Sequence, residues 1–141
     1  MKQKLNCIML IDDDEPTNFV STIYIEEAQC TEHIQITESG QKALNYLTSS
    51  EEFGSDNNKF PCPDLIFLDI NMPAMDGWEF LDEYKQLKKD QHGKVIIIML
   101  TTSLNPDDSI RAGKIPEISG FAIKPLTAEL IDEVLQEHFD W

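Results

Sequence analysis

The chain has 141 residues, of which 41% are hydrophobic and 26% are charged, a size and composition that predict one globular domain over residues 1–141. Its formal net charge is −15 at pH 7, which argues against direct contact with nucleic acid because neutralising phosphates requires clustered Lys or Arg. No apolar run approaches the roughly 20 residues of a membrane span, and the first residues lack the apolar segment of a signal peptide. We therefore expect a cytoplasmic protein without membrane contact.

Cysteine and histidine usage indicates neither a disulfide framework nor a zinc site. The three cysteines, Cys7, Cys30 and Cys62, are widely spaced and form no CxxC pair. The three histidines are also dispersed, and none lies at ligand spacing from a cysteine or another histidine. We interpret Cys7 as a small buried strand residue and assign no role to the other two.

The first part of the chain alternates between short apolar runs and helical patterns. Residues 5–11 and 33–37 predict two short strands. Between them, Pro16 suits the first turn of a helix ending near residues 29–32, with Asp14 or Glu15 placed to cap it. Apolar residues of this helix recur at spacings of three and four, so we expect one stripe to face a sheet: Phe19, Val20, Ile23, Tyr24 and Ala28. Ser39-Gly40 opens a second helix.

The middle of the chain contains two further predicted strands and a helix. The polar stretch 48–60 predicts a loop or a helix extension, and a third strand runs from near Asp64 to Asp69. Pro73 and Gly77 then break the strand, and a helix follows from Gly77 into the charged residues 88–90. Its apolar positions are Trp78, Phe80, Leu81, Tyr84 and Leu87. Residues 94–100 form the most continuous β-branched run and predict a central strand.

The last part repeats the same alternation. Asn105 caps a helix that Gly113 and Pro116 cut short, and residues 119–123 predict a fifth strand. Thr127 caps the final helix, which runs to, or close to, Trp141. Strand and helix alternate five times, and this order predicts an α/β fold with a parallel sheet, right-handed crossovers and helices on both faces.

Polar residues follow four of the predicted strands. Carboxylates follow strands one and three, a hydroxyl follows strand four and an ammonium follows strand five; the residues are Asp12, Asp13, Asp69, Thr101 and Lys124. In a parallel sheet all of them lie at one edge. Three crowded carboxylates repel each other, and a hard divalent cation such as Mg²⁺ relieves that repulsion. Taken singly, each residue has an ordinary role as a helix cap, a strand-end hydroxyl or a surface lysine.

Together these groups suit a transferred phosphoryl group. Asp69 would be the nucleophile and would form an acyl phosphate. Mg²⁺ and Lys124 would neutralise phosphoryl oxygens in the transition state, while Thr101 would bond a third oxygen.

The same residues carry a resemblance to a known family. The motifs Leu10-Ile11-Asp12-Asp13-Asp14, residues 68–77 (LDINMPAMDG), Met99-Leu100-Thr101 and Phe121-Ala122-Ile123-Lys124-Pro125 resemble response-regulator receiver domains of two-component signalling. The motifs span almost the whole chain in the family's order. The resemblance implies a doubly wound (βα)5, flavodoxin-like fold with sheet order 2-1-3-4-5, in a stand-alone receiver that has no effector domain.

The resemblance also implies roles for individual residues. Asp69 takes a phosphoryl group from a sensor histidine kinase or a histidine phosphotransfer protein. Mg²⁺, for which Mn²⁺ can substitute, is held by Asp13, Asp69 and the backbone carbonyl of Asn71, with Asp12 holding a metal-bound water. Lys124, followed by a cis bond to Pro125, contacts the phosphoryl group, and Thr101 and Phe121 switch together.

Output is expected through the fourth helix, fifth strand and last helix. That surface would contact a downstream protein target or a second copy in a homodimer, or the phosphoryl group would be relayed onward. By this resemblance the chain catalyses its own phosphorylation and dephosphorylation and is not a conventional turnover enzyme. One departure from the family pattern is Thr102, where a smaller residue is common.

Two other classes of protein share parts of this pattern. Phosphohydrolases of the haloacid-dehalogenase-like kind also use an aspartyl phosphate, but their nucleophile strand usually carries DxD and comes first, whereas here Asn71 replaces the second aspartate. A flavodoxin-like binding module would have no use for Lys124. It would also need a phosphate-cradling glycine loop after strand one, which the chain lacks.

Overall fold

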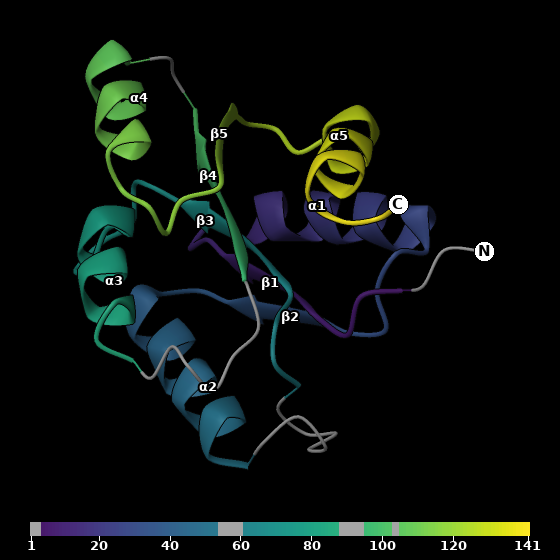
Figure 1. Cartoon of the computed structure of the whole chain (residues 1–141), viewed down its shortest axis with the longest axis horizontal. Coiled ribbons are helices and arrows are strands. Elements are labelled where there is room, and N and C mark those ends of the chain that lie inside the picture. The colour runs from purple at the N-terminus through teal and green to yellow at the C-terminus, as the bar shows by residue number, and fades with distance from the viewer. Residues whose placement is uncertain (1–3, 54–60, 88–94, 103–104) are drawn as a thin grey trace.

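A five-stranded parallel sheet forms the centre of the protein (Figure 1). The computed structural model describes residues 4–53, 61–87, 95–102 and 105–141. The strands are β1 (Ile8–Ile11), β2 (Ile34–Thr37), β3 (Leu65–Asp69), β4 (Ile96–Thr101) and β5 (Gly120–Ile123). Their order is β2-β1-β3-β4-β5, which confirms the predicted doubly wound topology.

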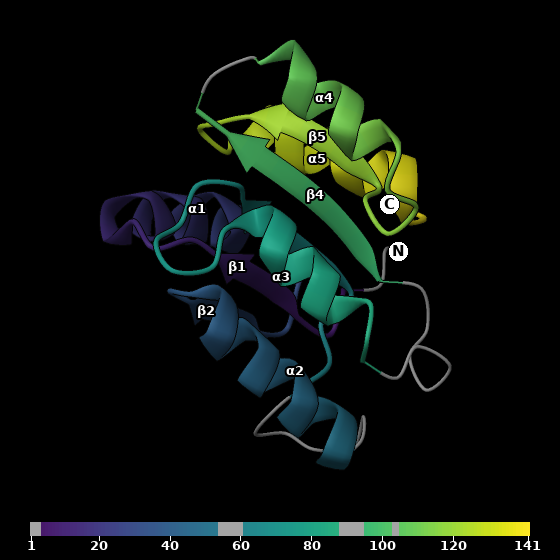
Figure 2. The ribbon, with the colours of Figure 1, turned by 90° about the vertical axis from the view of Figure 1, so that its left-hand side faces the viewer.

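Helices cover both faces of the sheet, as Figures 1 and 2 show. They are α1 (Glu15–Ala28), α2 (Gly40–Phe53), α3 (Gly77–Tyr84), α4 (Pro106–Gly113) and α5 (Ala128–His138). The first and last helices pack together on one face, and the other three lie on the opposite face. Alternate residues of β1 and β3 enter the two cores, since strand side chains point to opposite faces in turn.

Side-chain caps fix where the helices begin. The Asp14 carboxylate accepts a hydrogen bond from the amide of Thr17 at 3.0 Å, so Asp14 rather than Glu15 is the cap of α1. Asp76 and Glu79 form a capping box at the start of α3. Asn105 and Thr127 cap α4 and α5 as predicted.

The predicted apolar stripe of α1 is wrong for three of its five members. Phe19 is 68% exposed, Val20 43% and Ile23 40%, while Tyr24 and Ala28 pack partly against the core. The helix instead buries Asn18, Ser21 and Ile25. Asn18 determines this rotation, because its side-chain amide donates to the carbonyl of Asp12 at 2.9 Å and must therefore face the sheet.

The end of α3 differs from prediction, whereas the end of α5 lies close to Trp141 as expected. The α-helix of α3 ends at Tyr84, with Lys85 as its cap, and the expected end at residues 88–90 lies outside the described residues. Helix α5 ends at His138, and Trp141 packs partly buried against the core without continuing the helix. Of the polar stretch 48–60, the helix includes residues up to Phe53, and residues 54–60 lie outside the described ranges.

Three further expectations are confirmed. Helix α4 is short, with eight residues. The peptide bond between Lys124 and Pro125 is cis. Cys7 is fully buried as expected, although it lies immediately before β1 and not within the strand. Over the described ranges, the structure contains no helix long and apolar enough to cross a membrane.

Candidate functional site

Four strand ends converge at the carboxyl edge of the sheet. Ile11 pairs with Leu68, so the next residues, Asp12 and Asp69, end neighbouring strands side by side. Thr101 ends β4, and its backbone carbonyl accepts a hydrogen bond from the amide of Lys124 at 2.7 Å. The topology therefore brings the sequence-predicted residues of four strands to one place.

Lys124 lies between two buried carboxylates. Its Nζ is 2.5 Å from Oδ2 of Asp12 and 3.1 Å from Oδ1 of Asp69, and all three side chains are largely buried. Burial opposes the charge of this ammonium, but its bonds to Asp12 and Asp69 outweigh burial and raise the pKa of Lys124. The ammonium is therefore a fixed positive charge at the edge of the sheet.

Asp69 is held in an environment that disfavours its charge. Burial, followed by repulsion from the neighbouring Asp12 carboxylate, raises the pKa of Asp69 above its ordinary value. Lys124 and a hydrogen bond from the backbone of Asn71 act in the opposite direction without cancelling the shift. The site thus has more negative charge than its single ammonium balances, and a bound cation would favour the ionised carboxylate.

Two buried polar residues that the sequence did not indicate hold Asp12 in place. The amide of Asp12 donates to the carbonyl of Thr37 at 3.1 Å, and the side chain of Asn18 donates to the carbonyl of Asp12 at 2.9 Å. A carboxylate oxygen of Asp12 also accepts from the amide of Asp14 at 2.9 Å. Asn18, Ser21 and Ile25 are spaced i, i+3, i+7 and so lie on one face of α1. A search for apolar residues alone misses this face, because two of the three residues are polar.

The loop after Asp69 folds back tightly onto it. The amide of Gly77 donates to the carbonyl of Ile70 at 2.8 Å, and a Cβ at Gly77 would lie 2.8 Å from the backbone oxygen of Asp69. Only glycine fits this approach. Within the same loop, Ala74 has a φ of 66°, a left-handed conformation that costs an L-residue free energy.

The same loop contacts the start of α2. A Cβ at Gly40 would lie 2.6 Å from the sulfur of Met75, so these two segments pack with no room for a side chain between them. The contact joins the turn after β2 to the loop after β3.

The residues expected to switch lie on β4 and β5. Thr101 is buried, and Phe121 is half-buried and packs against the core that α2 and α3 cover. Phe121 pairs with Met99 in the register between β4 and β5. Thr102, next to Thr101, is exposed.

The oxygen atoms present suit a hard divalent cation. One carboxylate oxygen each from Asp12, Asp13 and Asp69 lie within 4.8 Å of one another, with Asp13 exposed to solvent. Carboxylate oxygens with room for water are the ligands that Mg²⁺ and Mn²⁺ accept. The side chain of Asn71 is exposed, and its backbone hydrogen-bonds to the Asp69 carboxylate.

Comparison with known proteins agrees with this geometry. The response regulator Rcp1 of Synechocystis is 30% identical over 103 residues, 73% of this chain and 66% of Rcp1. The probable methanogenesis regulatory protein FilR2 of Methanothrix harundinacea is 26% identical over 130 residues, 92% of this chain and 79% of FilR2. A two component response regulator from Cytophaga hutchinsonii has a crystal structure that matches with a TM-score of 0.85 and 32% identity, covering 96% of this chain and 97% of that one. A sequence profile of the response regulator receiver domain matches residues 8–136, and the chain therefore belongs to the receiver domain family of response regulators.

Proposed function

We propose that this receiver domain accepts a phosphoryl group on Asp69 from a phosphohistidine of a sensor histidine kinase or a histidine phosphotransfer protein. The observation that carries the proposal is the position of the Lys124 ammonium, 2.5 Å from Asp12 and 3.1 Å from Asp69. A lysine that bridges two strand-end carboxylates neutralises charge at the place where an incoming phosphoryl group would add more of it.

The reaction is a transfer between two nucleophiles. A carboxylate oxygen of Asp69 forms a bond to phosphorus while the P–N bond to the donor imidazole breaks, and the imidazole keeps that electron pair and takes up a proton from solvent. Lys124 binds a phosphoryl oxygen, and the Thr101 hydroxyl donates to another. Water later attacks the same phosphorus and releases inorganic phosphate, which regenerates the carboxylate. The domain thus catalyses its own phosphorylation and dephosphorylation.

We further propose that the reaction requires Mg²⁺, with Mn²⁺ as a substitute. When bound, the ion neutralises phosphoryl oxygens and the surrounding carboxylates. Asp13, Asp69 and the backbone carbonyl of Asn71 would hold it, and Asp12 would hold a water bound to it. The clustered oxygens of Asp12, Asp13 and Asp69 and the raised pKa of Asp69 support this assignment.

Phosphorylation would then be read on the face formed by α4, β5 and α5. Thr101 would move to bond a phosphoryl oxygen, and Phe121 would turn into the space that Thr101 vacates. Ile110 on α4 is 58% exposed and Ile123 on β5 is 43% exposed, so this face offers apolar contacts to a downstream protein or to a second copy in a homodimer. These signalling events would take place in the cytoplasm.

The donor would approach over the N-terminal half of α1. This helix begins three residues after Asp12, and Phe19, Val20 and Ile23 form an exposed apolar patch on it, which we call the α1 patch. A protein that brings a phosphohistidine to Asp69 must stand at this edge of the sheet. The α1 patch is an exposed apolar surface on the helix that begins next to this edge.

A labelling experiment tests the nucleophile. Wild-type protein incubated with a radiolabelled phosphohistidine donor and Mg²⁺ should acquire base-labile label, and Asp69→Asn should acquire none. Asp82→Asn, on an exposed position of α3, is the matched control and should label as wild type does. Labelling of Asp69→Asn at the wild-type rate would show that another residue is the nucleophile. Turnover of para-nitrophenyl phosphate without a protein donor would instead favour a phosphohydrolase.

A further inference from the structure

The outer edge of β2 is open. β2 is an end strand of the sheet, and among the described residues no strand lies on its other side. The carbonyls of His33 and Thr37 accept hydrogen bonds of 3.0 and 3.1 Å from amides of the β1 segment, so these residues direct their backbone groups inward. Because backbone groups alternate along a strand, those of Ile34 and Ile36 point outward, where a further strand would pair.

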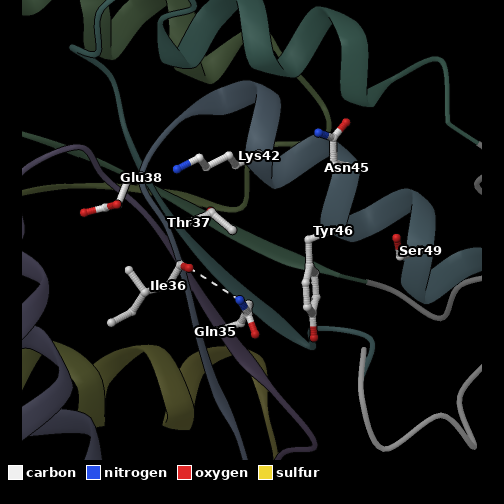
Figure 3. Close-up of a pocket in the computed structure, with 8 residues that line it drawn as sticks. All are labelled: Gln35, Ile36, Thr37, Glu38, Lys42, Asn45, Tyr46 and Ser49. Carbon is white, nitrogen blue, oxygen red and sulfur yellow. Dashed lines mark hydrogen bonds between the residues drawn. The ribbon is translucent and has the colours of Figure 1, made fainter.

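A side chain occupies part of this edge. The amide of Gln35 donates to the outward carbonyl of Ile36 over 3.4 Å, longer than the roughly 2.9–3.0 Å of an ordinary amide hydrogen bond (Figure 3). The bond is exposed to solvent, and the side chain of Ile36 is itself 40% exposed. An incoming backbone amide would replace a weak contact and bury an aliphatic side chain at the same position.

Two pockets flank this one strand, on opposite faces of the sheet. The α2-side pocket has a volume of about 370 Å³ and lies between β2 and the polar residues Lys42, Asn45 and Ser49 of α2. Figure 3 shows these side chains on the α2 side of the strand, with Ile36 directed away from them.

The α1-side pocket lies across the strand from it. Its volume is about 420 Å³, and its lining includes Ile25, Ile34 and Ile36 together with the carboxylates of Glu26 and Glu32. An extended segment beside β2 would therefore direct successive side chains into the two pockets in turn, since strand side chains alternate between faces.

We propose that β2 binds an extended segment of a partner protein, which adds to the sheet as an outer strand. Its alternate side chains are of two kinds. Those entering the α1-side pocket are aliphatic or basic, because an apolar floor there is bordered by Glu26 and Glu32 with Lys4 as the opposing cation. Those entering the α2-side pocket are small, polar and uncharged, because its lining combines Asn45 and Ser49 with the opposite charges of Lys42 and Glu38.

Charge selects a partner protein over a second copy of this chain. If two β2 strands paired antiparallel about Gln35, Glu32 of one would face Glu38 of the other at both ends, an arrangement of like charges that destabilises strand pairing. A segment with basic residues meets attraction at the same positions.

A peptide titration tests the proposal. The probe is the acetylated and amidated peptide Lys-Ser-Ile-Ser-Lys-Ser, added to the ¹⁵N-labelled full chain and followed by amide chemical shifts. The expected result is saturable binding with the largest shifts in β2 and in the residues of the two pockets. Absence of binding at millimolar peptide, or shifts centred on another element, would overturn the proposal.

Backbone methylation separates strand addition from charge attraction. Two versions of the peptide carry N-methyl groups on alternate residues, one version on the first, third and fifth residues and the other on the second, fourth and sixth. Composition and charge are the same, but only one set of amides can face β2. One version should bind about tenfold more weakly than the unmodified peptide, through loss of the edge hydrogen bonds, and the other should bind as well. Equal binding by both would overturn the proposal.

Two matched protein variants test the same proposal independently. Ile36→Pro removes an outward amide, and Ile36→Val retains it on a similar side chain. The first should lose about tenfold in peptide affinity while the second binds as wild type does, with thermal melts recorded for both. The methylated peptides act on the wild-type chain, so the test stands even if Ile36→Pro does not fold. A wild-type dimer in sedimentation that Ile36→Pro abolishes would assign the edge to a second copy and overturn the proposal.

Discussion

Phe19 offers the sharpest test of how a phosphodonor approaches this domain. The side chain is 68% exposed, on the helix that begins beside the proposed phosphoacceptor site. Fully burying a phenylalanine side chain is worth about 1.5–3 kcal/mol, so burial of the exposed part against a donor is worth about 1–2 kcal/mol. Phe19→Ala should therefore lower kcat/KM for phosphotransfer from a protein donor by about 5- to 30-fold.

The assay compares two donors. The protein donor is the histidine kinase or phosphotransfer protein that labels the wild-type chain fastest in a profile against those of the host. The second donor is acetyl phosphate, which is too small to reach from Asp69 to the α1 patch. Phe19→Ala should slow transfer from the protein donor and leave the rate with acetyl phosphate unchanged.

Ile110→Ala is the matched control, because it truncates a similarly exposed apolar side chain on α4. It should leave both rates unchanged. Both variants should keep the wild-type free energy of unfolding to within about 0.5 kcal/mol, since neither residue is in the core. If Phe19→Ala and Ile110→Ala transferred at the same rate as wild type from the protein donor, the α1 patch would not be the docking surface.

Further predictions concern the site and its loop. Because the pKa of Asp69 is raised, the folded state binds the Asp69 proton more tightly than the unfolded state does. The free energy of unfolding, measured by urea denaturation with EDTA present, should therefore fall as the pH rises from the ordinary pKa of 3.8 through the raised pKa. The variant Asp69→Asn should not show this decrease. Mg²⁺ at a hundred times its Kd should add about 2.7 kcal/mol to wild-type stability and much less to Asp13→Asn, measured by thermal melting. Gly77→Ala should lower stability by about 1–3 kcal/mol through the clash with the Asp69 backbone, and an unchanged Tm would contradict that contact. Ala74→Gly should raise stability by about 0.5–1 kcal/mol at an unchanged urea m-value, because it relieves the left-handed backbone.

Most of the fold could be predicted from local pattern. Short apolar runs bounded by turn residues identified the five strands, and the caps Asn105 and Thr127 are where the sequence placed them. The convergence of Asp12, Asp69 and Lys124 also followed from the sequence, since the topology of a parallel sheet brings strand ends together whatever the details of packing.

The orientation of α1 could not be predicted in this way. Counting apolar residues placed Phe19 and Ile23 in the core, but a buried hydrogen bond from Asn18 to the backbone of Asp12 competes with that pattern and determines which face turns inward. A hydrophobic pattern contains no information about such a bond. The exposed α1 patch was therefore visible only in the structure.

The tight packing around the loop after Asp69 has a consequence for how a signal can spread. On one side Gly40 leaves no space beside Met75, and on the other Gly77 leaves none beside the backbone of Asp69. The loop thus packs closely against the start of α2 through Met75 and against the start of α3 through the backbone of Asp69. Helix α4, by contrast, buries only Ala112 among its eight residues. If Asp69 is phosphorylated as proposed, we expect a displacement there to meet close packing toward α2 and α3 and a mostly exposed helix at α4, which would favour a response at α4 and β5.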